Sequence, residues 1–208
     1  MFKGNLTSDG LPRSEKAAYI AAGAHSGLIP VLGEVRGHPQ NATGLVMSLI
    51  APSFVNLAEP PSLESCTRDS YSVESRFTLA TVLNIALSVA KAAEHLHSKG
   101  VMHGDLYAHN ILWNAQSDCL LGDFGAASFV PLHNLHFAMS VQRIEVRAFS
   151  CLLEELLDRC EVSPKEQYVF DAMCNLQWRC TQLDVNARPL FDEIQSVLLS
   201  LDAVLISS

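Results

Sequence analysis

Four polar residues in the middle of the chain have side chains suited to transferring a group to a hydroxyl. They are His103, Asp105, Asn110 and Asp123, and all lie within residues 101–127. A carboxylate such as Asp105 can orient a hydroxyl nucleophile and accept its proton. The side-chain oxygens of Asn110 and Asp123 are ligands that Mg²⁺ prefers, and a divalent ion neutralises charge on a transferred phosphoryl group. These residues predict metal-assisted phosphoryl transfer, with Asp105 as base and Asn110 and Asp123 as metal ligands.

The order and spacing of these residues match two linked motifs. Residues 103–106 with Asn110 read as H-x-D-L-x-x-x-N, and residues 123–125 read as D-F-G. Short apolar runs on either side predict small strands that fix the two loops. The stretch resembles the protein-kinase superfamily. The resemblance implies an α+β fold with a reduced N-terminal lobe of few strands and one helix, a mainly helical C-terminal lobe, and ATP and Mg²⁺ as cofactors.

Two distal segments extend the resemblance over nearly the whole chain. Residues 188–191 resemble the R-P-x-F segment that precedes the last helix of protein kinases. Residues 144–150 resemble the start of the large buried helix, where Glu145 would replace the family's aspartate and clamp the catalytic-loop backbone. An ordinary acidic residue in a first helical turn is the alternative for Glu145.

The resemblance also implies residues of an adenine pocket. Met47 would guard the back of the pocket, the backbone from Ser48 to Ile50 would form the hinge, and Leu112 would lie under the base.

Apolar patterns predict the elements of the N-terminal part. Residues 14–24 are Ala-rich with a helical pattern, and residues 28–32 and 44–50 read as strands on either side of a turn. We assign the whole chain, 1–208, to one kinase-like domain, in which residues 1–51 are a partial N-lobe with the hinge.

The remaining residues, 52–208, are assigned to the C-lobe. Residues 52–75 are rich in Pro, Ser and charged residues without a clear period, which predicts a surface excursion after the hinge. A helix from about Thr78 to Ser98 has small and apolar residues at three- and four-residue spacing, so one face should pack inward. Lys99-Gly100 ends it just before the catalytic loop.

The side that should grip ATP departs from the family pattern. No Gly-rich loop occurs upstream, and Lys3 is the only candidate for the strand lysine, with a solvated surface charge as the alternative. Glu15 is the best candidate for its partner on the helix, and Glu34 is a second one. These departures imply weakened ATP binding.

The side that should receive the substrate departs as well. Gly104 replaces the arginine that reads a phosphorylated activation loop in many kinases, so control by that charge is not expected. No A-P-E occurs between Asp123 and Glu145, so Arg188 would lack its usual glutamate partner. Such shortened domains look like the kinase-like modules that some bacteria fuse to leucine-rich repeats.

Composition is that of a globular domain, with 208 residues, 49% hydrophobic and 17% charged. No apolar run approaches the roughly 20 residues of a membrane span, and the first ten residues lack a signal-peptide core, so we expect a soluble, cytoplasmic protein. The six cysteines form no C-x-x-C pair, so neither a zinc site nor a disulfide framework is indicated. A net charge of −8 argues against nucleic acid as a partner. Nucleotide and an unidentified protein remain.

Three functions stay open. The first is an ATP-dependent protein kinase of Ser/Thr type. The second is a catalytically weak module that binds nucleotide or a partner, because the Gly-rich loop and the lysine are missing. The third is a small-molecule phosphotransferase of the aminoglycoside or choline kinase type, in which H-G-D is also typical. The R-P-x-F segment favours the first over the third, and His109 inside the loop is expected to be a structural hydrogen-bonding residue rather than a catalytic one.

Overall fold

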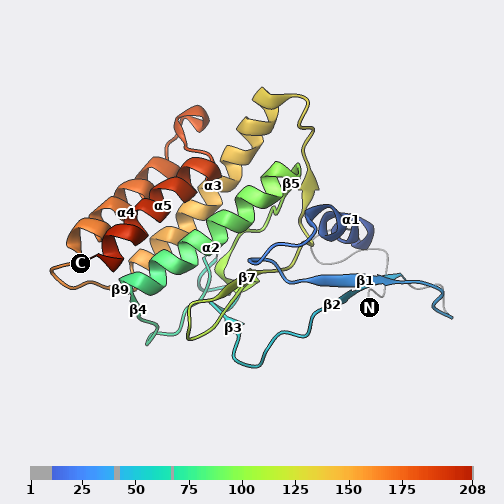
Figure 1. Cartoon of the computed structure of the whole chain (residues 1–208), viewed down its shortest axis with the longest axis horizontal. Helices are drawn as coiled ribbons and strands as arrows, with labels where there is room; N and C mark the ends of the chain where they lie inside the picture. Colours follow the sequence, from blue (N-terminus) through green and yellow to red (C-terminus); the bar gives the residue numbers. More distant parts are fainter. Residues whose placement is uncertain (1–10, 40–42, 67, 208) are drawn as a thin grey trace.

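In the computed structural model, helices and short strands are mixed along the chain, which confirms the α+β prediction (Figure 1). The structure describes residues 11–39, 43–66 and 68–207. In chain order the elements are α1 (Pro12–Ala22), β1 (Val31–Val35), β2 (Gly44–Met47), β3 (Val55–Asn56), β4 (Phe77–Thr78), α2 (Leu79–Ser98), β5 (Val101–Met102), η1 (Ala108–Asn110), β6 (Ile111–Trp113), β7 (Cys119–Leu121), β8 (Ser128–Phe129), α3 (Leu135–Leu157), β9 (Cys160–Glu161), α4 (Gln167–Cys180), η2 (Val185–Ala187) and α5 (Phe191–Ile206).

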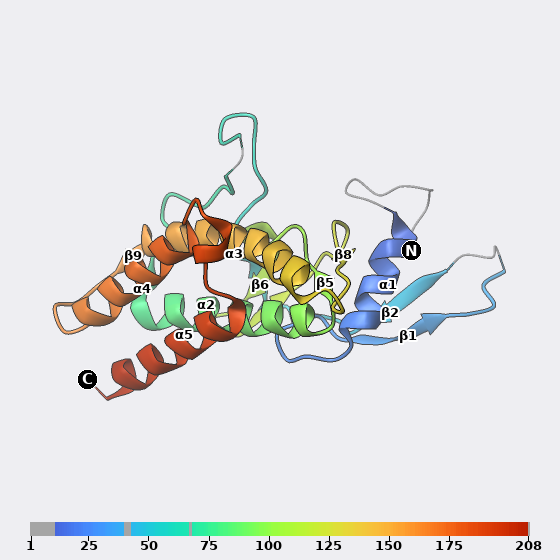
Figure 2. The same ribbon diagram turned by 90° about the horizontal axis from the view of Figure 1, so that it is seen from above.

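Four long helices form the body of the molecule. α5 packs along α2 and α4 packs along α3, as both views show (Figures 1 and 2). α2 begins after Thr78, whose side chain accepts a hydrogen bond from the Thr81 backbone N–H at 3.2 Å. Its inward face is fully buried, as predicted, at Leu79, Leu83, Ala86, Ala90 and Ala93. Within the described ranges, none of the helices combines the length and apolar character that a bilayer span requires.

α1 and the antiparallel pair β1–β2 lie at the end of the molecule away from the C-terminus (Figure 1). The first strand begins at Val31, three residues later than predicted from 28–32. Leu28 is instead buried and bridges Leu121 of β7, so this residue joins the catalytic half of the chain rather than the β1–β2 pair. The helix also begins earlier than predicted, at Pro12, because proline suits the first turn of a helix.

The segment predicted as a surface excursion is partly built into the fold. Its strand β3 pairs antiparallel with β6, which in turn pairs with β7. Leu57 and Ala58 are buried, and so is the carboxylate of Asp69. The excursion prediction for residues 52–75 is therefore wrong at these positions, because their partners lie far away in the sequence.

The long helix α3 begins at Leu135, nine residues before the predicted start at Ile144. The Asn134 side chain accepts a hydrogen bond from the Phe137 N–H at 3.2 Å and caps the helix. Glu145 therefore lies in the middle of a helix and is buried. The alternative of a first-turn acid is wrong.

Candidate active site

The catalytic-loop residues Asp105 and Asn110 are in direct contact. The loop runs from β5 through the short turn η1 into β6, and this path turns both side chains toward each other. Asn110 Nδ2 donates to Asp105 Oδ2 at 2.8 Å and to the Asp105 backbone oxygen at 2.9 Å. These bonds occupy the amide nitrogen, so Asn110 Oδ1 is the atom left to face a metal ion. The Asp105 side chain is 29% exposed, which leaves its carboxylate accessible to an acceptor hydroxyl.

Asp123 is brought next to Asn110 by the pairing of β6 with β7. The Gly122 N–H donates to the Asn110 backbone oxygen at 3.0 Å, and Asp123 follows directly with a φ of 53°. Its Oδ1 accepts a hydrogen bond from the Gly125 N–H at 3.0 Å. One carboxamide oxygen and one carboxylate form a hard donor set that fits Mg²⁺, which completes its shell with water and phosphate oxygens.

Three rings connect α1 with the two motifs. Tyr19 of α1 lies 4.3 Å from the Phe124 ring, and Phe124 lies 5.1 Å from the His103 ring, measured between centroids. His103 Nε2 donates to the Gly122 backbone oxygen at 2.8 Å, because a carbonyl can only accept. His103 thus holds the second motif against the first.

The helix candidate Glu15 lies one turn before Tyr19 on α1, on the same face. Burial raises the pKa of Tyr19 to about 12, and the negative charges of Glu15 and Asp123 add to this rise. Because Tyr19 contacts Phe124 of the second motif, the face of α1 that carries Glu15 and Tyr19 is the face toward that motif.

A buried carboxylate holds the start of the catalytic loop. Glu145 Oε1 accepts a hydrogen bond from the Gly104 N–H at 2.7 Å, and Oε2 pairs with His97 Nε2 at 2.6 Å. Burial by itself would raise the pKa of Glu145, but the hydrogen bond and charge of His97, together with His103 and the Gly104 N–H, lower it overall. The predicted contact between Glu145 and the loop backbone is confirmed.

Gly104 has a conformation that a side chain would not fit. Its φ is 81°, and an added Cβ would lie 2.3 Å from the Ala126 backbone oxygen. This close approach gives a physical reason for glycine where the resembling family carries arginine.

The residues predicted to surround an adenine lie in or directly after strands β2 and β6. Met47 ends β2, and the Ser48 N–H donates to the Pro30 backbone oxygen at 2.9 Å. Ile50 follows two residues later and is half-buried, while Leu112 lies in β6 between β3 and β7.

The segment between α1 and β1 is hydrogen-bonded to β7, which directly precedes the second motif. The Leu121 N–H donates to the Gly27 backbone oxygen at 2.8 Å, and the Ile29 N–H donates to the Leu121 oxygen at 3.4 Å. These bonds connect the segment before β1 with the strand that leads to the predicted metal ligand Asp123.

The remaining predicted residues have different outcomes. Lys3 lies outside the described residues. Glu34 pairs with Lys16 of α1 at 3.2 Å, which is its nearest cation within the described ranges. Arg188 donates to the backbone oxygens of Gln182 and Arg143 at 2.7 and 3.0 Å, and these carbonyls take the place of the family's glutamate.

Sequence reasoning missed Asp69 entirely. Both of its carboxylate oxygens bind His109, through the ring Nδ1 at 2.8 Å and the backbone N–H at 3.0 Å. The prediction that His109 is a structural hydrogen-bonding residue is confirmed. Asp69 carried no signal, since it stands alone in a Ser-rich segment far from the motifs.

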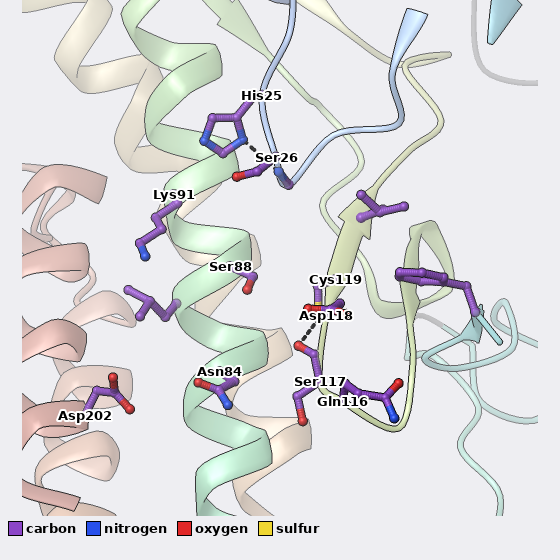
Figure 3. Close-up of a pocket in the computed structure, with 14 residues that line it drawn as sticks. His25, Ser26, Asn84, Ser88, Lys91, Gln116, Ser117, Asp118, Cys119 and Asp202 are labelled. Atoms are coloured by element: carbon purple, nitrogen blue, oxygen red, sulfur yellow. Dashed lines mark hydrogen bonds between the residues drawn. The ribbon is translucent and has the colours of Figure 1, made fainter. Parts of the chain in front are cut away.

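A separate cleft of about 600 Å³ lies between α2 and the turn that joins β6 to β7 (Figure 3). His25, Ser88, Lys91 and Asp118 are among its lining residues. Asp105, Asn110 and Asp123 are not, so this cleft is distinct from the candidate site.

Comparison with known proteins agrees with this geometry. A family model described as protein kinase domain matches residues 54–146. This match and the similar kinases below support membership of the chain in the protein-kinase superfamily. The matched residues contain both kinase motifs and end just after Glu145, so they include Asp69 and Glu145, which contact the catalytic loop, and His97, which pairs with Glu145.

Individual kinases show the same similarity. The dual serine/threonine and tyrosine protein kinase of Canis lupus familiaris is 28% identical over 173 residues, covering 65% of this chain and 19% of that protein. The probable serine/threonine-protein kinase kinX of Dictyostelium discoideum is 26% identical over 60% of this chain and 15% of its own length. The tyrosine-protein kinase hopscotch of Drosophila melanogaster is 31% identical over 49% of this chain and 9% of its own length. The chain thus spans about a fifth or less of these kinases.

Proposed function

We propose that this chain is a phosphotransferase of the protein-kinase type that uses Mg²⁺ and ATP and transfers to a serine or threonine hydroxyl. The observation that carries the proposal is the contact of Asp105 with Asn110, beside Asp123. It combines an accessible base with two hard oxygen ligands within one loop pair.

Each residue has a distinct role in this proposal. Asp105 orients the acceptor hydroxyl and takes its proton. Asn110 Oδ1 and the Asp123 carboxylate hold Mg²⁺, which neutralises charge on the phosphates when bound. The Asn110 amide also donates to the Asp105 carboxylate, so the same residue binds the metal ion and positions the base.

The proposed adenine pocket is formed by residues in and next to strands β2 and β6. Met47 closes the back of the pocket, the backbone from Ser48 to Ile50 binds the adenine edge, and Leu112 lies under the base. Residues 1–51 act as the partial N-lobe with the hinge, and residues 52–208 act as the C-lobe.

The experiment is transfer of labelled γ-phosphate from Mg²⁺–ATP to the chain itself and to dephosphorylated casein. We expect Asp105→Asn to lower the rate about 10²- to 10⁴-fold, the usual worth of a positioned base. Asp171→Asn is the matched control, because that carboxylate is exposed on α4 and accepts a hydrogen bond from Gln167 on the same helix. Equal rates in wild type and Asp105→Asn would overturn the assignment.

Metal binding is tested separately by thermal shift. Mg²⁺–ATP should raise the melting temperature of wild type and not that of Asp123→Ala. A shift without turnover in wild type would favour a nucleotide-binding kinase-like module, for which the missing Gly-rich loop and strand lysine are the motivating observations. Transfer to an aminoglycoside or choline but not to casein would favour a small-molecule phosphotransferase.

A further inference from the structure

The end of the catalytic loop is held by a carboxylate that belongs to neither motif. The Asp69 side chain is completely buried, and both of its oxygens bind the same residue. Oδ1 accepts from His109 Nδ1 at 2.8 Å, and Oδ2 accepts from the His109 backbone N–H at 3.0 Å. A carboxylate only accepts, so Nδ1 is the donor and the ring cannot turn without breaking a bond. Two bonds to one residue fix both its backbone and its ring.

This fixed histidine lies beside the proposed base. His109 Nε2 is 3.8 Å from Asp105 Oδ2, the same oxygen that accepts from Asn110 Nδ2 at 2.8 Å. His109 and Asn110 are neighbours in the turn η1, so a shift of the His109 backbone also shifts Asn110. The position of Asp105 Oδ2 therefore depends on the turn that Asp69 holds.

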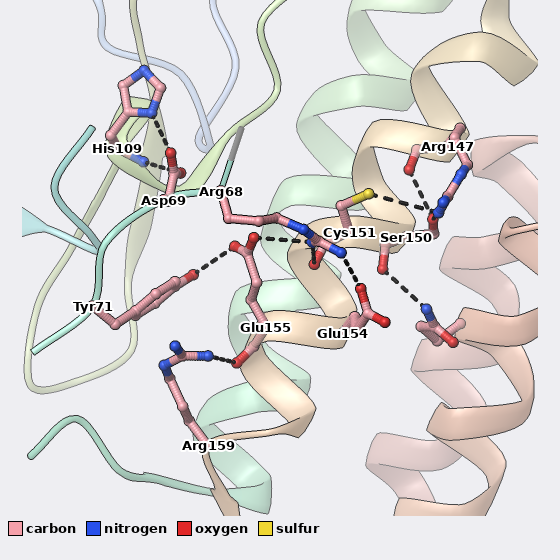
Figure 4. A network of polar contacts seen from close by, with 11 residues as sticks. Arg68, Asp69, Tyr71, His109, Arg147, Ser150, Cys151, Glu154, Glu155 and Arg159 are labelled. Carbon is pink, nitrogen blue, oxygen red and sulfur yellow. Dashed lines mark hydrogen bonds and ion pairs between the residues drawn. The ribbon is translucent and has the colours of Figure 1, made fainter. Parts of the chain in front are cut away.

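Asp69 is itself anchored on the long helix α3. Its neighbour Arg68 forms ion pairs with Glu154 and Glu155, and the Tyr71 hydroxyl donates to Glu155 at 3.3 Å (Figure 4). Figure 4 shows Asp69 and His109 at one side of this network and α3 at the other. The segment thus connects the body of the molecule with the end of the loop.

The anchor is strengthened from its other side. The Arg159 guanidinium lies 4.1 Å from the centre of the Tyr71 ring, and its NH1 donates to the Glu155 backbone oxygen at 2.8 Å. Glu59 and Ser70 pair through two backbone hydrogen bonds of 2.9 Å, which close the segment into a loop. Asp69 therefore lies between Arg68, which is paired with α3, and Ser70, which is paired with Glu59.

We propose that Asp69 and His109 are positioning residues for the phosphoryl-transfer site. Asp69 holds His109, and His109 holds the turn that sets Asp105 and Asn110. This role rests on the proposed function, because it acts through the base and the metal ligand named there.

The test compares four variants of the full chain. Asp69→Ala and His109→Ala remove the contact, whereas His109→Asn keeps a donor in the position of Nδ1. We expect kcat to fall about 10- to 100-fold in both alanine variants, as expected when a group that orients a reacting residue is lost. The KM for ATP should stay within about threefold, because other elements form the adenine side, and His109→Asn should recover most of kcat. His136→Ala, an exposed histidine on α3, is the matched control and should behave as wild type.

Hydrogen exchange of backbone amides gives a readout that needs no turnover. Asp69→Ala should speed exchange at residues 108–110 and leave Gly104, which Glu145 holds, unchanged. If Asp69→Ala does not fold, Asp69→Asn is measured in the same way, because its single carbonyl oxygen cannot accept from both His109 donors.

The two proposals fail in different ways. Unchanged exchange at residues 108–110 in Asp69→Ala would overturn the positioning role. If wild type transfers phosphate, alanine variants that keep its kcat would overturn the role too. A loss of kcat that His109→Asn does not recover would overturn it as well. No transfer by wild type would overturn the proposed function instead, while the exchange data would still decide whether Asp69 holds the loop.

Discussion

The two ends of the catalytic loop are held by the same chemistry in different surroundings. At the start, Glu145 binds the Gly104 N–H and the ring of His97. At the end, Asp69 binds the backbone N–H and the ring of His109. In both places, a buried carboxylate satisfies one backbone donor and one histidine.

The surroundings differ in depth. Glu145 lies in the middle of α3 and His97 lies on α2, so their pair is inside the helical body. Asp69 belongs to a segment outside the long helices, whose neighbouring ion pair joins Arg68 and Glu154, each 44% exposed. Substitutions at the start of the loop should therefore lower the free energy of unfolding strongly. Substitutions in the segment that holds its end should lower it less.

The largest expected effect comes from removing the buried acid at the start of the loop. Glu145→Ala leaves His97 and the Gly104 N–H without their partner, and breaking a buried pair costs about 3–5 kcal/mol in the free energy of unfolding. Urea unfolding followed by circular dichroism measures it. Glu154→Ala makes the same change on the same helix at a half-exposed site and should cost about 1 kcal/mol or less. Similar losses in both variants would contradict the difference in depth.

A smaller effect is expected from adding one carbon at the start of the loop. Gly104→Ala forces a side chain into a φ of 81° and against the Ala126 oxygen, which should cost about 1–3 kcal/mol. Thermal unfolding tests this value. Gly33→Ala is the control, since an added Cβ there meets no atom within 4 Å. A Gly104→Ala protein as stable as wild type would show that the loop start can move.

Acid should act on the start of the loop through Glu145. Its pKa in the folded protein is lowered: burial raises it, but His97 and the Gly104 N–H outweigh burial. A group with a lowered pKa stabilises the fold above its unfolded value, and this stability is lost as pH falls through the folded value. The wild type should therefore lose stability relative to Glu145→Gln as pH drops below the ordinary value of 4.5. If the stability difference between wild type and Glu145→Gln stays constant across the acid range, Glu145 is not ionised in the folded protein.

The smallest effect on stability is expected at the other end of the loop. Arg68→Ala removes ion pairs that are partly exposed, so it should cost only about 0.2–1 kcal/mol. The unfolding free energy checks this value, and hydrogen exchange at residues 108–110 checks whether the loop end loosens at the same time. A loss as large as that of Glu145→Ala would remove the contrast between the two ends.

Much of the site was predictable because its parts are close in sequence. Asp105 and Asn110 are five positions apart, and the motif spacing assigned both to one loop, although their direct contact is seen only in the structure. The helix α2 was also predictable, since its buried positions repeat with the helical period. The start of α3 was missed because Leu135 and Phe137, in its first turn, are exposed and give no inward stripe.

The sequence by itself predicted the class of reaction and determined the order of the candidate catalytic groups, because both depend on residue types within one short stretch. Only the tertiary structure decided what holds that stretch. Glu145 lies 41 positions from Gly104, and Asp69 lies 40 positions from His109. A carboxylate in a sequence gives no sign of which distant backbone N–H it will accept from, because burial and direction arise only when the helices pack. The two ends of the loop were therefore placed by the fold.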